Sequence, residues 1–249
     1  MALEPWRTGT VIRIEEAAYN TRRFFIKVNE LESFHFKAGQ FVTLDLPIHE
    51  QKNKRWRSYS IASWPDGTNV YELLIVLLEG GAGTNYLFHE VTVGSELTFR
   101  GAQGVFTLPE NIEKDLFFIC TGTGIAPFRS MLNYMQLHNI SHKNLYLIFG
   151  CRTQKDLLYY EEMRTLESKI NNFFYMPTLS REGWDGYKGY VHSLYEEICK
   201  KNNEACENMQ NLNPASFYLC GWKAMIDDAR QKIAALGYDR KAIHLELYG

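Results

Sequence analysis

The stretch Leu116-Phe-Phe-Ile-Cys-Thr-Gly-Thr-Gly-Ile-Ala-Pro127 decides the fold class of this 249-residue chain. Its apolar residues predict a buried strand, and Thr121, Gly122, Thr123 and Gly124 predict a tight turn. Pro127 suits the first turn of a helix, where a backbone amide proton is not needed. Amides at a helix N-terminus attract phosphate, so this stretch predicts a pyrophosphate site. A plain strand-to-helix turn is the alternative.

Downstream of this stretch, apolar strands alternate with helical segments. We predict strands at residues 116–120, 145–149, 173–179, 217–220 and 244–247, and helices at residues 128–137, 156–169, 192–200 and 223–236. This alternation predicts a parallel sheet with helices on both faces. The second strand ends in Ile148-Phe-Gly-Cys-Arg152, without the carboxylate that holds the ribose in ordinary Rossmann dehydrogenases. An ordinary dehydrogenase is therefore disfavoured.

Upstream of this stretch, short strands are separated by turn residues. They are expected at residues 9–14, 23–28, 40–46, 57–62, 70–78 and 96–100, which predicts an antiparallel barrel or sandwich. The polar segment 109–115 separates the two patterns. We therefore predict two domains, at residues 1–110 and 111–249.

Composition limits the classes of partner. The formal net charge is −2, which predicts no nucleic-acid partner. Five widely spaced cysteines predict a reducing compartment, and neither they nor the seven histidines have metal-ligand spacing. No signal segment and no membrane span are evident, so we expect a cytoplasmic protein. The aromatic content of 14% indicates either bulky cores or surfaces that stack on planar rings.

Several motifs in order resemble those of the ferredoxin–NADP reductase superfamily. Arg57-Ser-Tyr-Ser60 resembles its flavin motif, residues 121–130 its nucleotide motif, residues 218–225 its C-G-x-x-x-M motif, and Glu246-Leu-Tyr248 its plant-type ending. Residues 101–106 and 150–159 also match, so the resemblance extends from about residue 38 to the end. It implies an antiparallel Greek-key β-barrel FAD-binding domain followed by an α/β parallel-sheet NADP-binding domain.

The resemblance implies an FAD site in the first half. Arg57 would bind the FAD pyrophosphate, Tyr59 would lie along the flavin ring, and Ser60 would lie near flavin N5, with Ser58 between them. Residues 81–87 resemble the second flavin segment, with Thr84 in place of serine, and imply that Gly83 and Thr84 bind phosphate. Thr84 is also expected to be a helix N-cap. Ala102 replaces the proline that is common in the family.

It implies an NADP(H) site in the second half. The glycine-rich turn would bind pyrophosphate, while Ser180, Arg181, Lys188 and Tyr190 would surround the 2′-phosphate and adenine. Two cations near one anion favour NADPH over NADH, although Arg181 and Lys188 could also be solvated loop charges. The complete set carried over for NADP is Thr121, Gly122, Thr123, Gly124, Pro127, Arg152, Ser180, Arg181, Lys188, Tyr190, Gly221 and Met225.

Four residues are the expected catalytic set: Ser60, Cys220, Glu246 and Tyr248. Cys220 would line the path of the hydride, and Glu246 would relay protons. Tyr248 would stack on the second flavin face, although Gly249 extends this chain by one residue beyond the plant-type ending.

The implied function is hydride transfer between NADPH and FAD N5, followed by single-electron transfer to ferredoxin or flavodoxin. The basic run of residues 52–57 could attract such an acidic carrier, or could be a solvated loop. We expect a monomer. The alternatives are an NADH-dependent reductase component of an oxygenase and a non-turnover flavin-binding electron-transfer subunit.

Overall fold

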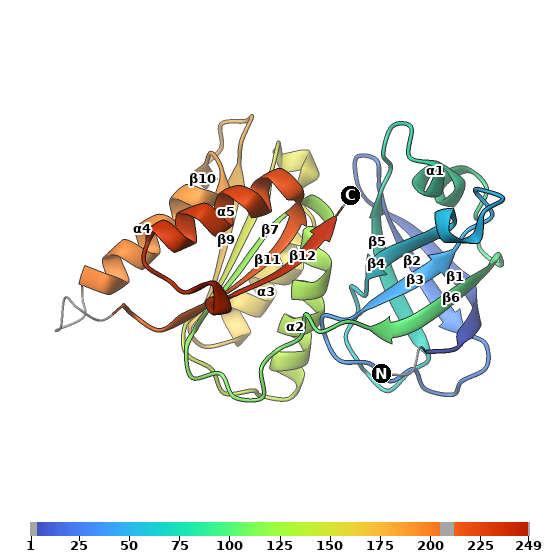
Figure 1. The fold of residues 1–249 in the computed structure, drawn as a ribbon, viewed down its shortest axis with the longest axis horizontal. Coiled ribbons are helices and arrows are strands. Elements are labelled where there is room, and N and C mark those ends of the chain that lie inside the picture. Colours follow the sequence, from blue (N-terminus) through green and yellow to red (C-terminus); the bar gives the residue numbers. More distant parts are fainter. Residues whose placement is uncertain (1–3, 205–211, 249) are drawn as a thin grey trace. The chain divides into compact units, whose positions relative to one another are not determined.

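The computed structural model describes residues 4–204 and 212–248 (Figure 1). Contacts divide these residues into two compact units. The first unit comprises the described residues up to Leu108 together with Ala126–Tyr134, and the second comprises Pro109–Ile125 and the described residues from Met135 onward. Cys206 and Gly249 lie outside the described residues.

The first unit is an antiparallel barrel. Its strands are β1 (Trp6–Ala18), β2 (Thr21–Val28), β3 (Phe41–Asp45), β4 (Trp56–Ser60), β5 (Val70–Val76) and β6 (Glu96–Gln103), and its order is β4-β3-β6-β1-β2-β5. A bridge between Ile61 and Leu73 joins the two outer strands and so closes the sheet. Each of the six predicted strands is present. The predicted antiparallel barrel is confirmed.

The core of this barrel comes from one face of each strand, because side chains alternate along a strand. Phe24, Val42, Tyr71 and Phe99 are fully buried there, and the rings of Tyr71 and Phe99 lie 5.1 Å apart between centroids. Burying each large side chain of this kind contributes roughly 1.5–3 kcal/mol. The packed core gives the end of β4 a firm support. The short helix α1 (Ala82–His89) follows β5.

The second unit contains a parallel sheet. Its strands are β7 (Asp115–Thr121), β8 (Leu145–Cys151), β9 (Phe173–Leu179), β10 (Tyr187–Lys188), β11 (Ala215–Trp222) and β12 (Ile243–Tyr248), in the order β10-β9-β8-β7-β11-β12. Every pair of neighbouring strands is parallel. The predicted parallel α/β arrangement is confirmed, and β10 is a strand that the sequence did not predict.

The helices cover both faces of this sheet (Figure 1). They are α3 (Tyr160–Lys169), α4 (Val191–Glu204) and α5 (Lys223–Ala235). Helix α2 (Ala126–Leu137) follows β7 along the chain and belongs mostly to the first unit. Side chains of α4 and α5 pack in one cluster with Phe117 and Met176. The neighbouring Tyr175 instead contacts Arg164 of α3, so α3 lies on the opposite face. Such two-sided burial explains the nearly continuous apolar sequence of β7.

Candidate functional site

The predicted flavin motif, residues 57–60, forms the end of β4. Arg57 donates from Nη1 to the carbonyls of Lys54 at 3.0 Å and Trp56 at 2.8 Å. Tyr59 packs against the barrel core, and burial raises its pKa to about 12 while the charge of Arg57 opposes this. The phenol therefore remains a neutral group. Ser60 is buried at the end of the strand.

Ser58 points to the other face of β4, because it lies between Arg57 and Tyr59 in an alternating strand. Its hydroxyl lies 3.0 Å from the hydroxyl of Thr43. The structure therefore brings Arg57 and Tyr59 to one face and leaves the Ser58 side chain away from them.

The start of helix α1 lies against Arg57. A Cβ on Gly83 would lie 3.0 Å from Arg57 Cγ and 3.2 Å from Nε, so any side chain at this position would press on Arg57. The first amides of a helix have no partner within the helix. The Arg57 side chain thus lies against the first turn of α1 at Gly83, where no side chain intervenes. This cradle fits the pyrophosphate of FAD.

Thr84 is not the N-cap of α1, contrary to the expectation, because the helix begins earlier and its N-cap is Gly81. The Thr84 hydroxyl accepts from the Leu78 amide at 3.1 Å and donates to the Gly81 carbonyl at 3.1 Å. It therefore holds the loop before the helix. Any contact of Thr84 with phosphate would have to come from its backbone amide.

The glycine-rich turn, residues 121–125, follows β7 and contains Gly122 at φ +54°. Its Gly124 lies directly against the carbonyl of Cys220 on the adjacent strand β11. Thr121 Oγ1 is buried and has no hydrogen-bond partner among the described residues. Buried polar atoms are normally satisfied, so this hydroxyl is available to bind a phosphate oxygen. The geometry fits a dinucleotide pyrophosphate.

Cys220, Glu246 and Tyr248 lie together at the ends of β11 and β12. Cys220 is directly opposite Glu246 in the parallel register. Burial raises the pKa of the fully buried Cys220 thiol well above its usual value, and the Glu246 carboxylate raises it further. A hydrogen bond from Tyr248 acts in the opposite direction. Cys220 is thus a neutral thiol at ordinary pH. Ser60 belongs to the first unit.

The residues predicted to bind the 2′-phosphate follow β8 and β9. The Arg181 amide donates to the Arg152 carbonyl at 3.0 Å, and the Ser180 hydroxyl donates to the Cys151 carbonyl at 3.2 Å. The loop then returns to the same sheet edge, because Lys188 pairs with Leu179. Arg181 and Lys188 are therefore exposed at one edge.

Tyr190 follows this loop and is exposed. Pro127 lies in the first turn of α2, and Met225 lies in α5 beside Gly221. Glu182 is a loop residue that sequence reasoning missed: its carboxylate accepts from the Gln154 amide at 2.8 Å. This bond ties the loop after β9 to the loop after β8. A carboxylate directly after Ser180-Arg181 was the only sequence signal for it.

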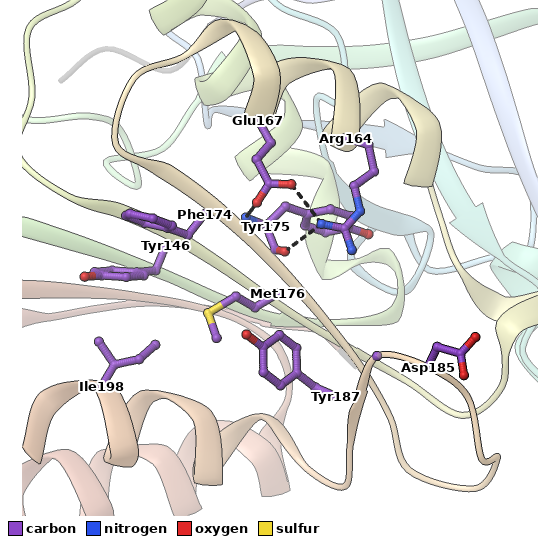
Figure 2. A pocket seen from close by; sticks show the side chains of 10 residues that line it. Tyr146, Arg164, Glu167, Phe174, Tyr175, Met176, Asp185, Tyr187 and Ile198 are labelled. Atoms are coloured by element: carbon purple, nitrogen blue, oxygen red, sulfur yellow. Dashed lines mark hydrogen bonds and ion pairs between the residues drawn. The ribbon is translucent and has the colours of Figure 1, made fainter. Parts of the chain in front are cut away.

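A cavity of about 600 Å³ lies elsewhere in the second unit, at the edge of β9 (Figure 2). None of the predicted site residues lines it. In this cavity the Tyr175 amide donates to Glu167 at 2.7 Å, and the Tyr175 carbonyl accepts from Arg164 at 3.3 Å. These side chains cover a free strand edge, which otherwise invites pairing with another chain.

Among the described residues, no group of three or more His, Cys, Asp or Glu side chains could hold a metal ion. In the same part of the chain, no helix is both long enough and apolar enough to span a bilayer.

Two family models match the chain: the oxidoreductase FAD-binding domain over residues 8–108 and the oxidoreductase NAD-binding domain over residues 118–231. The ferredoxin–NADP reductase B of Sorangium cellulosum is 35% identical over 224 residues, covering 87% of each chain. The chain belongs to the ferredoxin–NADP reductase superfamily. This reductase is an FAD- and NAD(P)-binding oxidoreductase, so the predicted family, fold class and both types of cofactor are confirmed.

Other members of the superfamily match over different lengths. A ferredoxin NADP⁺ reductase from Neisseria gonorrhoeae with bound FAD and NADP is 25% identical, with a TM-score of 0.78 and coverage of 97% of this chain and 98% of that one. The anthranilate 1,2-dioxygenase electron transfer component of Acinetobacter baylyi is 33% identical over 79% of this chain and 53% of its own. The reductase thus spans about half the length of that relative.

Proposed function

We propose that this reductase transfers hydride between NADPH and FAD N5 and passes electrons singly to a small carrier such as ferredoxin or flavodoxin. The proposal is carried by one observation: Cys220, Glu246 and Tyr248 lie together at one end of β11 and β12. Strand β11 pairs with β7, the strand that leads into the glycine-rich turn. A nucleotide held by this turn would meet a neutral thiol, a carboxylate and an aromatic ring. Residues 1–110 would form the FAD-binding domain and residues 111–249 the NAD(P)-binding domain.

The first unit would hold FAD, which supplies hydride acceptance and single-electron release when bound. Arg57 and the start of α1 would bind its pyrophosphate, with Gly83 leaving room for it. Tyr59 would present its neutral ring to the flavin. The buried Ser60 hydroxyl would orient the ring and help to exclude water.

The second unit would hold and orient NADPH. Thr121 Oγ1 and the amides of the glycine-rich turn would bind the pyrophosphate, with Gly221, Met225 and Pro127 shaping this site. Arg181 and Lys188 would bind the 2′-phosphate, with Arg152 and Ser180 beside them, and Tyr190 would stack on adenine. Cys220 would line the site without charge, and the Glu246 carboxylate would hold or release a proton.

Tyr248 would stack on the flavin until nicotinamide displaces it. Removing Tyr248 and Gly249 should then tighten NADP⁺ binding and change the charge-transfer absorption of the flavin. An unchanged spectrum would contradict stacking, and the hydrogen bond of Tyr248 to Cys220 would then be its main role.

The basic run of residues 52–57 supports an acidic partner less strongly than its composition suggests. Lys52 and Lys54 are exposed, but Arg55 pairs with Asp45 at 2.8 Å and Arg57 is half-buried. A docking surface here would therefore depend mainly on the two lysines. Carrier-dependent cytochrome c reduction should fall as ionic strength rises from about 10 mM to 300 mM, because salt screens such steering. A rate insensitive to salt would contradict it.

Two alternatives are kept. The 33% identity to the anthranilate dioxygenase component favours an NADH-dependent reductase component of an oxygenase as the second candidate. A non-turnover electron-transfer subunit is the third. A cytoplasmic monomer remains our proposal for the state of the protein.

The deciding experiment is the absorption spectrum of the purified protein under anaerobic conditions. We expect a yellow FAD spectrum that NADPH bleaches faster than NADH, together with NADPH-dependent ferricyanide reduction. Faster bleaching by NADH would favour the oxygenase component. No bleaching by either nucleotide would contradict the proposed function and leave the non-turnover subunit.

A further inference from the structure

A chain of alternating charges in the first unit runs from the partly exposed Glu15 and Arg23 to the buried Glu72 and Arg129, and it ends on helix α2. The Glu72 side chain on β5 is 3% exposed. It accepts from Arg23 of β2 through Nε at 2.7 Å and Nη2 at 3.1 Å, and from Arg129 Nη1 of α2 at 2.9 Å. Arg23 in turn donates to Glu15 at 2.8 Å. Arg129 is itself only 6% exposed, and the Glu72 carboxylate compensates its buried charge.

Arg129 also binds the backbone that follows the predicted flavin motif. Its Nη1 donates to the Ala62 carbonyl at 2.9 Å, and the Ala62 amide donates to the Glu72 carbonyl at 2.8 Å. The guanidinium carbon lies 5.4 Å from the centroid of a Trp64 ring. Ala62 is the second residue after Ser60. One side chain of α2 is thus bonded to the segment that continues from Ser60.

Helix α2 begins where the glycine-rich turn ends. The turn belongs to the second unit, whereas Ala126–Tyr134 belongs to the first, so the Ile125–Ala126 peptide bond joins the two. Arg129 is the fourth residue of α2, about one turn from its start. Its bonds to Glu72 and Ala62 therefore fix the end of the helix that continues from the glycine-rich turn.

A buried ion pair is a poor device for stability alone, since the cost of desolvation offsets most of the Coulomb attraction. A guanidinium does impose direction, because its planar fork bonds acceptors only in fixed geometry. We propose that Arg129 is a positioning residue for hydride transfer: through Glu72 and Ala62 it fixes the start of α2, and with it the turn that receives the nucleotide pyrophosphate. This inference rests on the proposed function.

The test compares Arg129→Met with the matched control Arg23→Met. Each variant removes one arginine from Glu72, but only Arg129 lies on α2. The rate of flavin reduction by saturating NADPH is measured in an anaerobic single turnover. We expect Arg129→Met to slow it about tenfold or more, since displacements of about 1 Å can cost a hundredfold. Arg23→Met should keep the wild-type rate, even if its melting temperature falls as much as that of Arg129→Met.

The remaining readouts separate positioning from binding. FAD content and the Kd of NADP⁺ should change little in Arg129→Met, because the turn keeps its own contacts with the nucleotide. Arg129→Lys retains the charge but loses the fork, and should recover part of the rate. Where Arg129→Met fails to fold, Arg129→Lys and Glu72→Gln are compared with Arg23→Met in the same assay.

Equal rates in the Arg129 variants and the Arg23 control would overturn the inference. So would a loss that appears only as a raised Kd or KM for the nucleotide. A wild-type flavin that neither nucleotide reduces would instead contradict the proposed function, so the two failures are distinguishable.

Discussion

Gly221 lies directly against the Thr121 hydroxyl: a Cβ at position 221 would come within 2.6 Å of Thr121 Oγ1 and 2.9 Å of Met225 Cε. Gly221 also has a φ of +152°, which side chains disfavour. The Thr121 hydroxyl is the buried atom without a partner in the glycine-rich turn. A side chain at position 221 would therefore displace the Thr121 hydroxyl, which we assign to nucleotide binding.

Gly221→Ala should weaken NADP⁺ binding about tenfold, because a Cβ at this positive φ costs about 1–3 kcal/mol of backbone strain and displaces the Thr121 hydroxyl. Titration of the flavin difference spectrum measures the Kd. Gly67→Ala is the matched control, since Gly67 also has a positive φ, +85°, but a Cβ added there would meet no atom within 4 Å. Wild-type affinity in Gly221→Ala would remove Thr121 from the nucleotide site.

Gly83→Ala tests the cradle between α1 and Arg57. The added methyl group would press on Arg57 Cγ at 3.0 Å, and overpacking of about 1–3 kcal/mol should raise the Kd of FAD about tenfold. Alanine also favours a helix over glycine by about 0.5–1 kcal/mol, so α1 itself should not be weakened. Flavin fluorescence on titration of the apoprotein measures the Kd. Unchanged FAD affinity would place the pyrophosphate elsewhere.

Most strands and the type of each sheet were predictable because hydrophobic patterns are local, whereas the order of the strands was not. Apolar strands alternating with helical segments correctly predicted the parallel sheet, and short strands separated by turn residues predicted an antiparallel barrel or sandwich, of which the structure has the barrel. The helix predicted at 156–169 begins only at Tyr160. Tyr159, with φ +53°, breaks the path before it, and nothing in a tyrosine signals a left-handed backbone.

Contacts between distant charges could not be predicted. Glu72 is 49 positions from Arg23 and 57 positions from Arg129. In the sequence, each of the three is a charged residue of a type that is usually exposed. Glu72 on β5 and Arg129 on α2 become buried only when these two elements pack together, and no local sequence pattern reports that contact. Thr84 shows the same limit at short range, since its hydroxyl binds the preceding loop where a helix N-cap was expected.

Arg181→Ala tests the choice of nucleotide. A charge-assisted hydrogen bond contributes about 1.5–3 kcal/mol, so kcat/KM with NADPH should fall about 10- to 100-fold. The value with NADH should change little, because NADH has no 2′-phosphate. Lys155→Ala removes a positive charge from the neighbouring exposed turn, which has no assigned contact, and should preserve the NADPH preference. An unchanged ratio in Arg181→Ala would make the assignment of Arg181 wrong.

His192 should make the second unit less stable in mild acid. Its Nδ1 lies 2.9 Å from the Tyr195 hydroxyl, and its Nε2 lies 3.8 Å from Asp228 Oδ2. Burial lowers the His192 pKa, and Lys232 lowers it further, while Asp228 and Glu196 act in the opposite direction. Below the unfolded pKa of about 6.5, the unfolded chain therefore binds more protons than the folded one, and stability falls as pH falls.

His192→Gln keeps a polar group beside Tyr195 but cannot titrate. At pH 8 the imidazole is neutral in both folded and unfolded protein, so the difference in unfolding midpoint between variant and wild type gives a baseline. At pH 5.5 this difference should shift in favour of the variant, because only the wild type loses stability through His192. Urea unfolding followed by circular dichroism at both pH values measures it. The same difference at pH 8 and pH 5.5 would show that His192 titrates alike in the folded and unfolded states.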